Sequence, residues 1–342
     1  MGIYRTHLII DQRDSLKIKK LKLDNAKLIL VKEPSNCFWE AKDGMSFGHY
    51  IGGRDPKLAR KDEIPQLELL IEAVSEEKAE DLLSIIHGGM LLAYPEPGLT
   101  TNFVFLTEYN EKQNEWYSKK PFINYLKRIE HVGFGCQIAS LAVKDKQLIY
   151  AIEKYKVSLE LSSFTPKSAD PMYGQAFDNY DIKHSYHTRS AFAIVSAFSV
   201  IEEFGLEVRS SSTNPRFLNN ETGEWNPKVL KNITERLIQA NIDSQLTFDW
   251  IYRGEPTKIE LETKPLFGVD SKWIVYHKDV RDKTLTFPEA IHHASYLRNF
   301  IASHKFKELT QYISPYDVNN VQLLARQLII RKMKMWKTMM TD

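Results

Sequence analysis

Apolar and polar positions divide this 342-residue chain into a strand-rich first third and a helical remainder. Residues 17–23 alternate basic and apolar side chains, a pattern typical of a half-solvated strand. Asp24-Asn25 is a turn signal, so residues 26–31 are expected to form the paired strand. Residues 68–74 and 101–106 predict two further strands. The first third is therefore expected to be a mixed domain in which strands predominate.

One helix is expected among these strands. Ser75 can cap its free amides, and Glu76 and Glu77 favour the positive end of the helix dipole. The side chains of its buried stripe have helical spacing and are Ala79, Leu82, Leu83 and Ile86. His87-Gly88-Gly89 predicts the end of this helix, because glycine adopts the left-handed C-terminal conformation at low cost.

The periodicity becomes helical after Gly133 and Gly135, which indicate a flexible or tight stretch near the domain boundary. Residues 184–204 are apolar around nearly the whole helix circumference, which is typical of a helix at the centre of a domain. Residues 246–252 fit either a helix or a strand. The pattern thus predicts an α+β chain. Residues 1–135 form its mixed α/β N-terminal domain, and residues 136–342 form an all-α domain.

Three helix starts in the second domain have recognisable signals. Asn226 and Pro227 predict a cap and a first turn. Thr286-Phe287-Pro288-Glu289 is a capping box, and Ser314-Pro315-Tyr316-Asp317 has the same form. The last of these boxes opens a helix whose expected core face consists of Val318, Val321, Leu324, Leu328 and Ile329. Its basic end, residues 331–337, is expected to be solvated, with RNA or a membrane surface as the alternative partner.

Composition narrows the class of protein. Apolar residues make up 43% of the chain and charged residues 26%, as in ordinary globular proteins. The net charge of +2 excludes a strongly cationic nucleic-acid coat but allows a local basic groove. The cysteines, Cys37 and Cys136, have neither disulfide-framework nor zinc spacing. The apolar run at residues 191–195 is too short for a bilayer. We therefore expect a cytoplasmic protein without a membrane partner.

Candidate chemistry lies at the expected end of the helix that Thr286 opens. Arg298 precedes His304 by six residues, and Asn299 follows the arginine directly. The planar guanidinium fits a phosphate group, and an imidazole exchanges protons near neutral pH. The amide of Asn299 can bind the imidazole or a substrate oxygen. Together these side chains supply what is needed to break a phosphodiester bond.

Helical spacing places Arg298 at the border of a buried face. Ile291, Ala294, Leu297 and Ile301 cluster on one side of the helix, and Arg298 lies about 50° from the centre of that cluster. A charge at such a border needs a partner, which could be Glu202, Glu203 or a phosphate. A purely structural interpretation also fits: Arg298 pairs with a core carboxylate and His304 is an exposed helix end.

A different class of site is also present in the sequence. His184 and His187 have the spacing of metal ligands on a helix, and Asp178 or Asp181 could complete the set. This pattern would predict a metal-dependent hydrolase.

The stretch around Arg298 and His304 resembles the arginine-x4–6-histidine motif of HEPN domains (higher eukaryotes and prokaryotes nucleotide-binding). The polar residue after the arginine, Asn299, and the position between the last two helices fit that family. The hydrophobic helix at 184–204, with Glu202 and Glu203 near its end, also resembles the family's early helix. The resemblance covers roughly residues 140–342 and implies that the second domain is a HEPN-like helical bundle.

The resemblance implies metal-independent RNA cleavage without a cofactor, in which the ribose 2′-hydroxyl attacks the adjacent phosphorus. His304 would be the general base or acid, and Arg298 would stabilise charge on the phosphoryl oxygens. Asn299 would orient the reacting groups, and Glu202 and Glu203 would be supporting residues. It also implies RNA as partner and a homodimer through the helical domain. By analogy, the N-terminal domain would sense a trigger ligand or protein, as in bacterial toxins and antiphage effectors. The alternative is a non-catalytic HEPN-like module that binds RNA, a nucleotide or a protein.

Overall fold

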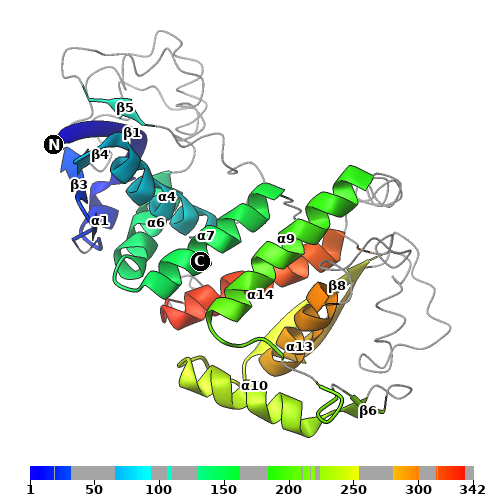
Figure 1. Ribbon diagram of the computed structural model, residues 1–342. Helices are drawn as coiled ribbons and strands as arrows, with labels where there is room; N and C mark the ends of the chain where they lie inside the picture. Colours follow the sequence, from blue (N-terminus) through cyan, green and yellow to red (C-terminus); the bar gives the residue numbers. More distant parts are fainter. Residues whose placement is uncertain are drawn as a thin grey trace. The chain divides into compact units, whose positions relative to one another are not determined.

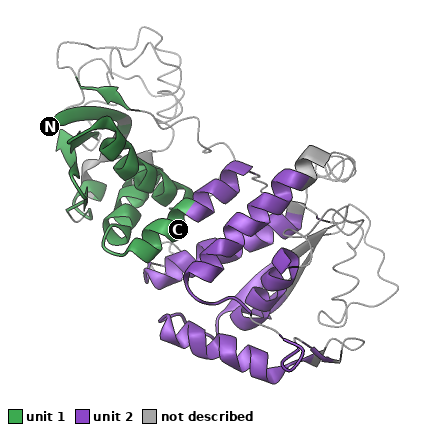
Figure 2. Ribbon diagram, in the orientation of Figure 1, with its two compact units in different colours: residues 1–153 green, residues 154–342 purple. Residues whose placement is uncertain are grey.

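The computed structural model in Figure 1 describes residues 1–18, 20–31, 66–93, 106–109, 129–161, 184–208, 211–215, 217–219, 224–253, 280–299, 313 and 315–335. The chain divides into two compact units, residues 1–153 and residues 154–342 (Figure 2). The division falls within helix α7 (Lys146–Leu161). The position expected for the boundary, between residues 135 and 136, lies inside helix α6 (Ile129–Ala142). This whole helix belongs to the N-terminal unit.

The N-terminal unit contains a five-stranded antiparallel sheet in the order β2-β3-β4-β1-β5. Its strands are β1 (Gly2–Asp11), β2 (Lys22–Leu23), β3 (Ala26–Val31), β4 (Gln66–Ala73) and β5 (Thr107–Glu108). The expected hairpin around Asp24 is confirmed, with Asp24 at φ 47° and Leu23 opposite Ala26. Of the strand expected at 17–23, only Lys22–Leu23 form a strand; residues 17, 18, 20 and 21 do not, and Lys19 lies outside the described residues. The strand expected at 101–106 lies outside the described residues except for Leu106.

Helices α1 (Gln12–Ser15), α4 (Glu76–Ala93) and α6 accompany this sheet. The expected stripe of α4 is buried, but the helix does not end at Gly88-Gly89. A Cβ on Gly89 would lie 2.5 Å from the carbonyl oxygen of Gly135, and one on Gly88 would collide with Ile152. These glycines therefore allow neighbouring helices to approach closely, and they do not terminate α4.

A charged pair lies within the sheet of this unit. Arg5 Nε is 2.7 Å from Glu68 Oε1, and the two side chains are only 8% and 2% exposed. The Arg5 guanidinium also lies 5.0 Å from the centre of the Tyr109 ring. Burial raises the pKa of the Glu68 carboxyl to about 7, although the nearby Arg5 charge opposes this rise.

The C-terminal unit contains helices α9 (His184–Glu203), α10 (Pro227–Gln239), α13 (Phe287–Leu297) and α14 (Pro315–Lys332). It also contains two antiparallel pairs, β6 (Phe217–Asn219) with β7 (Glu224–Trp225), and β8 (Thr247–Arg253) with β9 (Val280–Thr286). The expected all-α domain is therefore wrong. Residues 247–253 form a strand because buried Phe248 and Trp250 alternate with exposed Thr247 and Asp249. The molecule as a whole is mixed α and β, as expected.

Helices α7, α9 and α14 are joined by hydrogen bonds. The Ser158 hydroxyl donates to the Ala193 carbonyl at 2.8 Å, and the Ser196 hydroxyl donates to the Lys154 carbonyl at 2.8 Å. Gln322 donates to the Ser158 hydroxyl at 3.0 Å. The expected core face of α14 is confirmed, since Val318, Val321, Leu324, Leu328 and Ile329 are all buried. These contacts fix α9 along its length.

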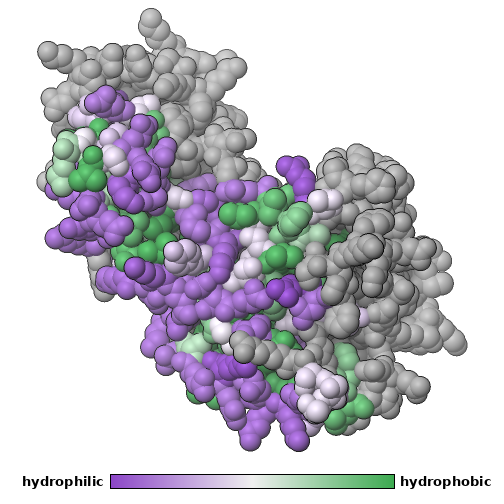
Figure 3. All heavy atoms as spheres, viewed as in Figure 1, coloured by the Kyte–Doolittle hydropathy of each residue, from purple (hydrophilic) through white to green (hydrophobic). Residues whose placement is uncertain are grey.

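Hydrophilic residues cover most of the described surface in Figure 3, and apolar residues form separate patches between them. The exposed apolar side chains include Ile238 of α10, which is 61% exposed, and Phe192 of α9, which is 59% exposed. No helix among the described residues is both long and apolar enough to cross a membrane.

The buried Glu68 predicts a pH-dependent stability of the N-terminal unit. Its folded pKa of about 7 exceeds the ordinary 4.5, so between these values the folded state binds more protons than the unfolded state. The free energy of unfolding should therefore fall as pH rises through this window, by up to about 1.4 kcal/mol per pH unit. Urea titrations from pH 4.5 to 7.5 measure this slope. Glu68→Gln should flatten it, whereas Glu72→Gln, a partly exposed partner of Lys27, should not. An unchanged slope in Glu68→Gln would refute this assignment.

Candidate functional site

Helix α13 begins with the capping box expected from the sequence. Thr286 Oγ1 accepts from the Glu289 backbone N–H at 3.4 Å, and Glu289 Oε2 accepts from the Thr286 backbone N–H at 2.8 Å. Pro288 lies in the first turn, where a missing N–H costs nothing. These contacts fix the register of the helix that carries Arg298.

Two adjacent histidines anchor α13 in the core. His292 lies edge-on to Trp225, with ring centres 3.9 Å apart, and His293 lies edge-on to Trp250 at 4.5 Å. Both imidazoles are buried, at 0% and 1% exposure. The pattern of apolar positions does not predict these contacts. The adjacent pair His292-His293 within an apolar helix was the only available signal, and it does not specify a partner.

Arg298 lies at the border of the buried face, as its helical spacing indicates. Ile291, Ala294 and Leu297 are fully buried, whereas the Arg298 side chain is 34% exposed. Its backbone stays helical, at φ −62° and ψ −48°, and its N–H bonds to the Ala294 and Ser295 carbonyls. Residues 298–299 then form a wider, π-type turn. Such turns re-aim side chains and are frequent at functional sites.

Among the described residues, Glu202, Asn299 and Phe198 lie against the Arg298 guanidinium. Nη2 lies 3.1 Å from Glu202 Oε1 of helix α9, and Nη1 donates to Asn299 Oδ1 at 2.9 Å. Its Cζ lies 5.7 Å from the centre of the Phe198 ring. Glu202 is 35% exposed, so the charged pair is open to solvent. We refer to Arg298, Asn299, Glu202 and Phe198 as the arginine site.

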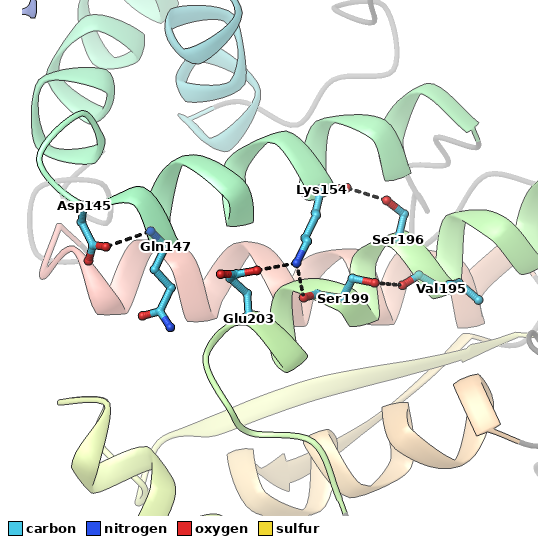
Figure 4. A network of polar contacts seen from close by, with 7 residues as sticks. All are labelled: Asp145, Gln147, Lys154, Val195, Ser196, Ser199 and Glu203. Atoms are coloured by element: carbon cyan, nitrogen blue, oxygen red, sulfur yellow. Dashed lines mark hydrogen bonds and ion pairs between the residues drawn. The ribbon is translucent and has the colours of Figure 1, made fainter. Parts of the chain in front are cut away.

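Glu203, another candidate from the sequence, binds a different cation. Glu203 forms an ion pair with Lys154 of α7, and the Lys154 ammonium also donates to the Ser199 carbonyl at 3.5 Å (Figure 4). Consecutive residues on a helix point about 100° apart, so α9 directs Glu202 to one neighbour and Glu203 to another. His304 lies outside the described residues.

The end of α9 concentrates negative charge. Helix C-termini carry partial negative charge, and here two glutamates are added to it. Cations from three helices offset this charge. Arg298 and Lys154 bind the carboxylates, and Arg236 donates to the carbonyls of Gly205 at 3.2 Å and Glu207 at 2.9 Å. Neither Lys154 nor Phe198 was anticipated from the sequence, because their role depends on helix packing.

The alternative metal site receives no support from the described residues. In this part of the chain, no group of three or more His, Cys, Asp or Glu side chains is placed to hold a metal ion. His184 and His187 lie in the first turn of α9, while Asp178 and Asp181 lie outside the described residues. At the basic end of α14, Lys332 donates to the Ala240 carbonyl at 3.2 Å, whereas Lys334 is exposed.

The Arg298–Glu202 pair should be weak but measurable. In a double-mutant cycle with Arg298→Met and Glu202→Gln, urea unfolding should give a coupling energy of about 0.2–1 kcal/mol, because both groups are one-third exposed. The matched cycle of Arg298→Met with Glu203→Gln should give no coupling beyond about 0.3–0.5 kcal/mol. If the two cycles gave equal coupling energies, Glu202 and Glu203 would not differ in their interaction with Arg298, and this assignment would be wrong.

No known protein family, no curated protein and no solved structure matches this chain.

Proposed function

We propose that this protein is a metal-independent endoribonuclease of HEPN type. The observation that carries the proposal is the placement of Arg298. Its guanidinium is held at the edge of a core, in a wider helical turn, with one-third of the side chain open to solvent. A permanently charged planar fork in this setting suits recognition of a phosphate.

The proposed reaction uses the RNA's own 2′-hydroxyl. As its oxygen bonds to the adjacent phosphorus, the bond from phosphorus to the 5′-oxygen breaks. The products are a 2′,3′-cyclic phosphate and a 5′-hydroxyl. A base removes the proton from the 2′-hydroxyl and an acid supplies one to the leaving oxygen. His304 is assigned to one of these transfers through the HEPN resemblance.

Arg298 is assigned to the charge that develops on the phosphoryl oxygens. Donors fixed before the reaction stabilise such charge without reorganisation. Asn299 holds one terminal nitrogen of the guanidinium, and Phe198 lies against the guanidinium. Both contacts restrict the rotation of the long Arg298 side chain. They support a positioning role for Asn299 and suggest the same role for Phe198.

A single arginine and histidine are few for two proton transfers. We therefore include in the proposal a homodimer through the helical domain, which would bring two copies of the motif together across a two-fold axis. Mass measurements of the free and the RNA-bound protein should show a dimer in at least one state. Monomers in both states would contradict this part of the proposal. The N-terminal unit is proposed to sense a trigger ligand or protein, in a toxin or antiphage role.

A non-catalytic HEPN-like module that binds RNA, a nucleotide or a protein is the second candidate. One observation fits it: Arg298 is paired with Glu202 and Asn299 within the fold, so its placement does not by itself require a catalytic role. A protein that only binds needs no group that transfers protons, so the two candidates differ in their dependence on His304.

Incubating the purified full chain with single-stranded RNA, with and without EDTA, tests the proposal. Wild-type cleavage should resist EDTA and leave 2′,3′-cyclic phosphate ends. Arg298→Ala and His304→Ala should each lower the rate by about 10²–10⁴-fold, the range of a lost general acid–base or electrostatic group. Arg189→Ala, which removes an exposed arginine of α9, should cleave like wild type. Binding without cleavage favours the second candidate, and cleavage that EDTA abolishes contradicts the mechanism.

A further inference from the structure

The arginine site is occupied by the chain itself. Glu202 Oε1 lies 3.1 Å from Nη2 of Arg298, and Asn299 Oδ1 accepts from Nη1 at 2.9 Å. A phosphate recognised by both arms of an arginine presents two oxygens to these same nitrogens. The Glu202 carboxylate, itself an anion, therefore competes with a phosphate for this guanidinium.

We infer that Glu202 is an autoinhibitory latch, whose carboxylate must leave Arg298 before an RNA phosphate can bind there. The inference rests on the proposed function, because it regulates the same site. Glu202 and a phosphate are both anions, so their simultaneous binding to one guanidinium is opposed by charge repulsion. Asn299 is neutral, so its bond to Nη1 adds no charge repulsion against a phosphate and can remain in place.

The strength of the pair suits a latch. With the Arg298 and Glu202 side chains 34% and 35% exposed, water and salt screen their attraction. A substrate phosphate that binds both arms of the guanidinium can therefore displace the carboxylate. The displaced carboxylate stays on α9 and continues to weaken anion binding. Removing its charge should consequently increase RNA affinity, and the gain should diminish at high salt.

The adjacent glutamate provides a matched control. Glu203 belongs to the same helical turn and carries the same charge, but Lys154 of α7 binds it (Figure 4). Replacing either glutamate with glutamine removes one negative charge and changes the overall charge equally. A difference between the two variants therefore reports the position of the carboxylate and not the net charge of the protein.

Fluorescence anisotropy with a labelled single-stranded RNA tests the latch in the full-length protein. Glu202→Gln should bind about three- to tenfold more tightly than wild type at low salt, and Glu203→Gln should bind as wild type does. Adding Arg298→Ala to Glu202→Gln should abolish the gain. If Arg298→Ala weakens binding while Glu202→Gln does not change it, the latch is wrong and the proposed function stands. If Arg298→Ala has no effect on binding or cleavage, the proposed function is wrong.

A second measurement tests the latch without RNA. Phenylglyoxal modifies arginine side chains, and peptide mass spectrometry gives the rate at each residue. Arg298 should react several-fold faster in Glu202→Gln than in wild type, while Arg236, which binds the carbonyls of Gly205 and Glu207, should react equally in both proteins. Equal Arg298 rates in wild type and Glu202→Gln would overturn the latch, whatever the RNA measurements show. Thermal unfolding of each variant confirms that the comparison is between folded proteins.

Discussion

The packing of α9 against α7 and α14 is the interaction on which the C-terminal unit depends. Ser158 reaches the α9 carbonyl of Ala193, and Ser196 of α9 reaches the α7 carbonyl of Lys154. These bonds fix the rotation of α9 about its own axis. Rotation decides which neighbour each glutamate meets, because consecutive side chains point about 100° apart. The Glu202–Arg298 pair is thus a consequence of serine–carbonyl hydrogen bonds made about two turns away along α9.

Charge at the end of α9 imposes a second constraint. Two carboxylates beside a helix C-terminus repel each other and the partial charge of the last carbonyls. The fold offsets this with side chains from α7, α10 and α13, and those side chains join the helices together. The same arrangement leaves Arg298 with one strong anionic neighbour and Lys154 with the other. The need to offset negative charge at the end of α9 therefore accounts both for the contacts that join the helices and for the position of Arg298.

Local signals in the sequence were sufficient for helix starts and for one hairpin. The Thr286 capping box, the Asn226 cap and the turn at Asp24 depend only on residues close in sequence, and the structure contains all three. Gly88 and Gly89 were misinterpreted, since their small size serves contacts with Ile152 and Gly135, far away in the sequence. For the same reason, periodicity placed Arg298 at the border of a core but could not choose between Glu202 and Glu203. That choice depends on how α9 packs.

The two arginine–glutamate pairs of this chain show why burial matters for function. Arg5 and Glu68 are 8% and 2% exposed, whereas Arg298 and Glu202 are 34% and 35% exposed. Separating a buried pair leaves an uncompensated charge away from water and costs about 3–5 kcal/mol, so such a pair does not exchange partners. Separating the pair that is one-third exposed costs little free energy, because water solvates both groups. Identical side chains thus form a pair shielded from solvent in the sheet and a pair open to solvent on α9, and the proposed exchange with an anion concerns only the second.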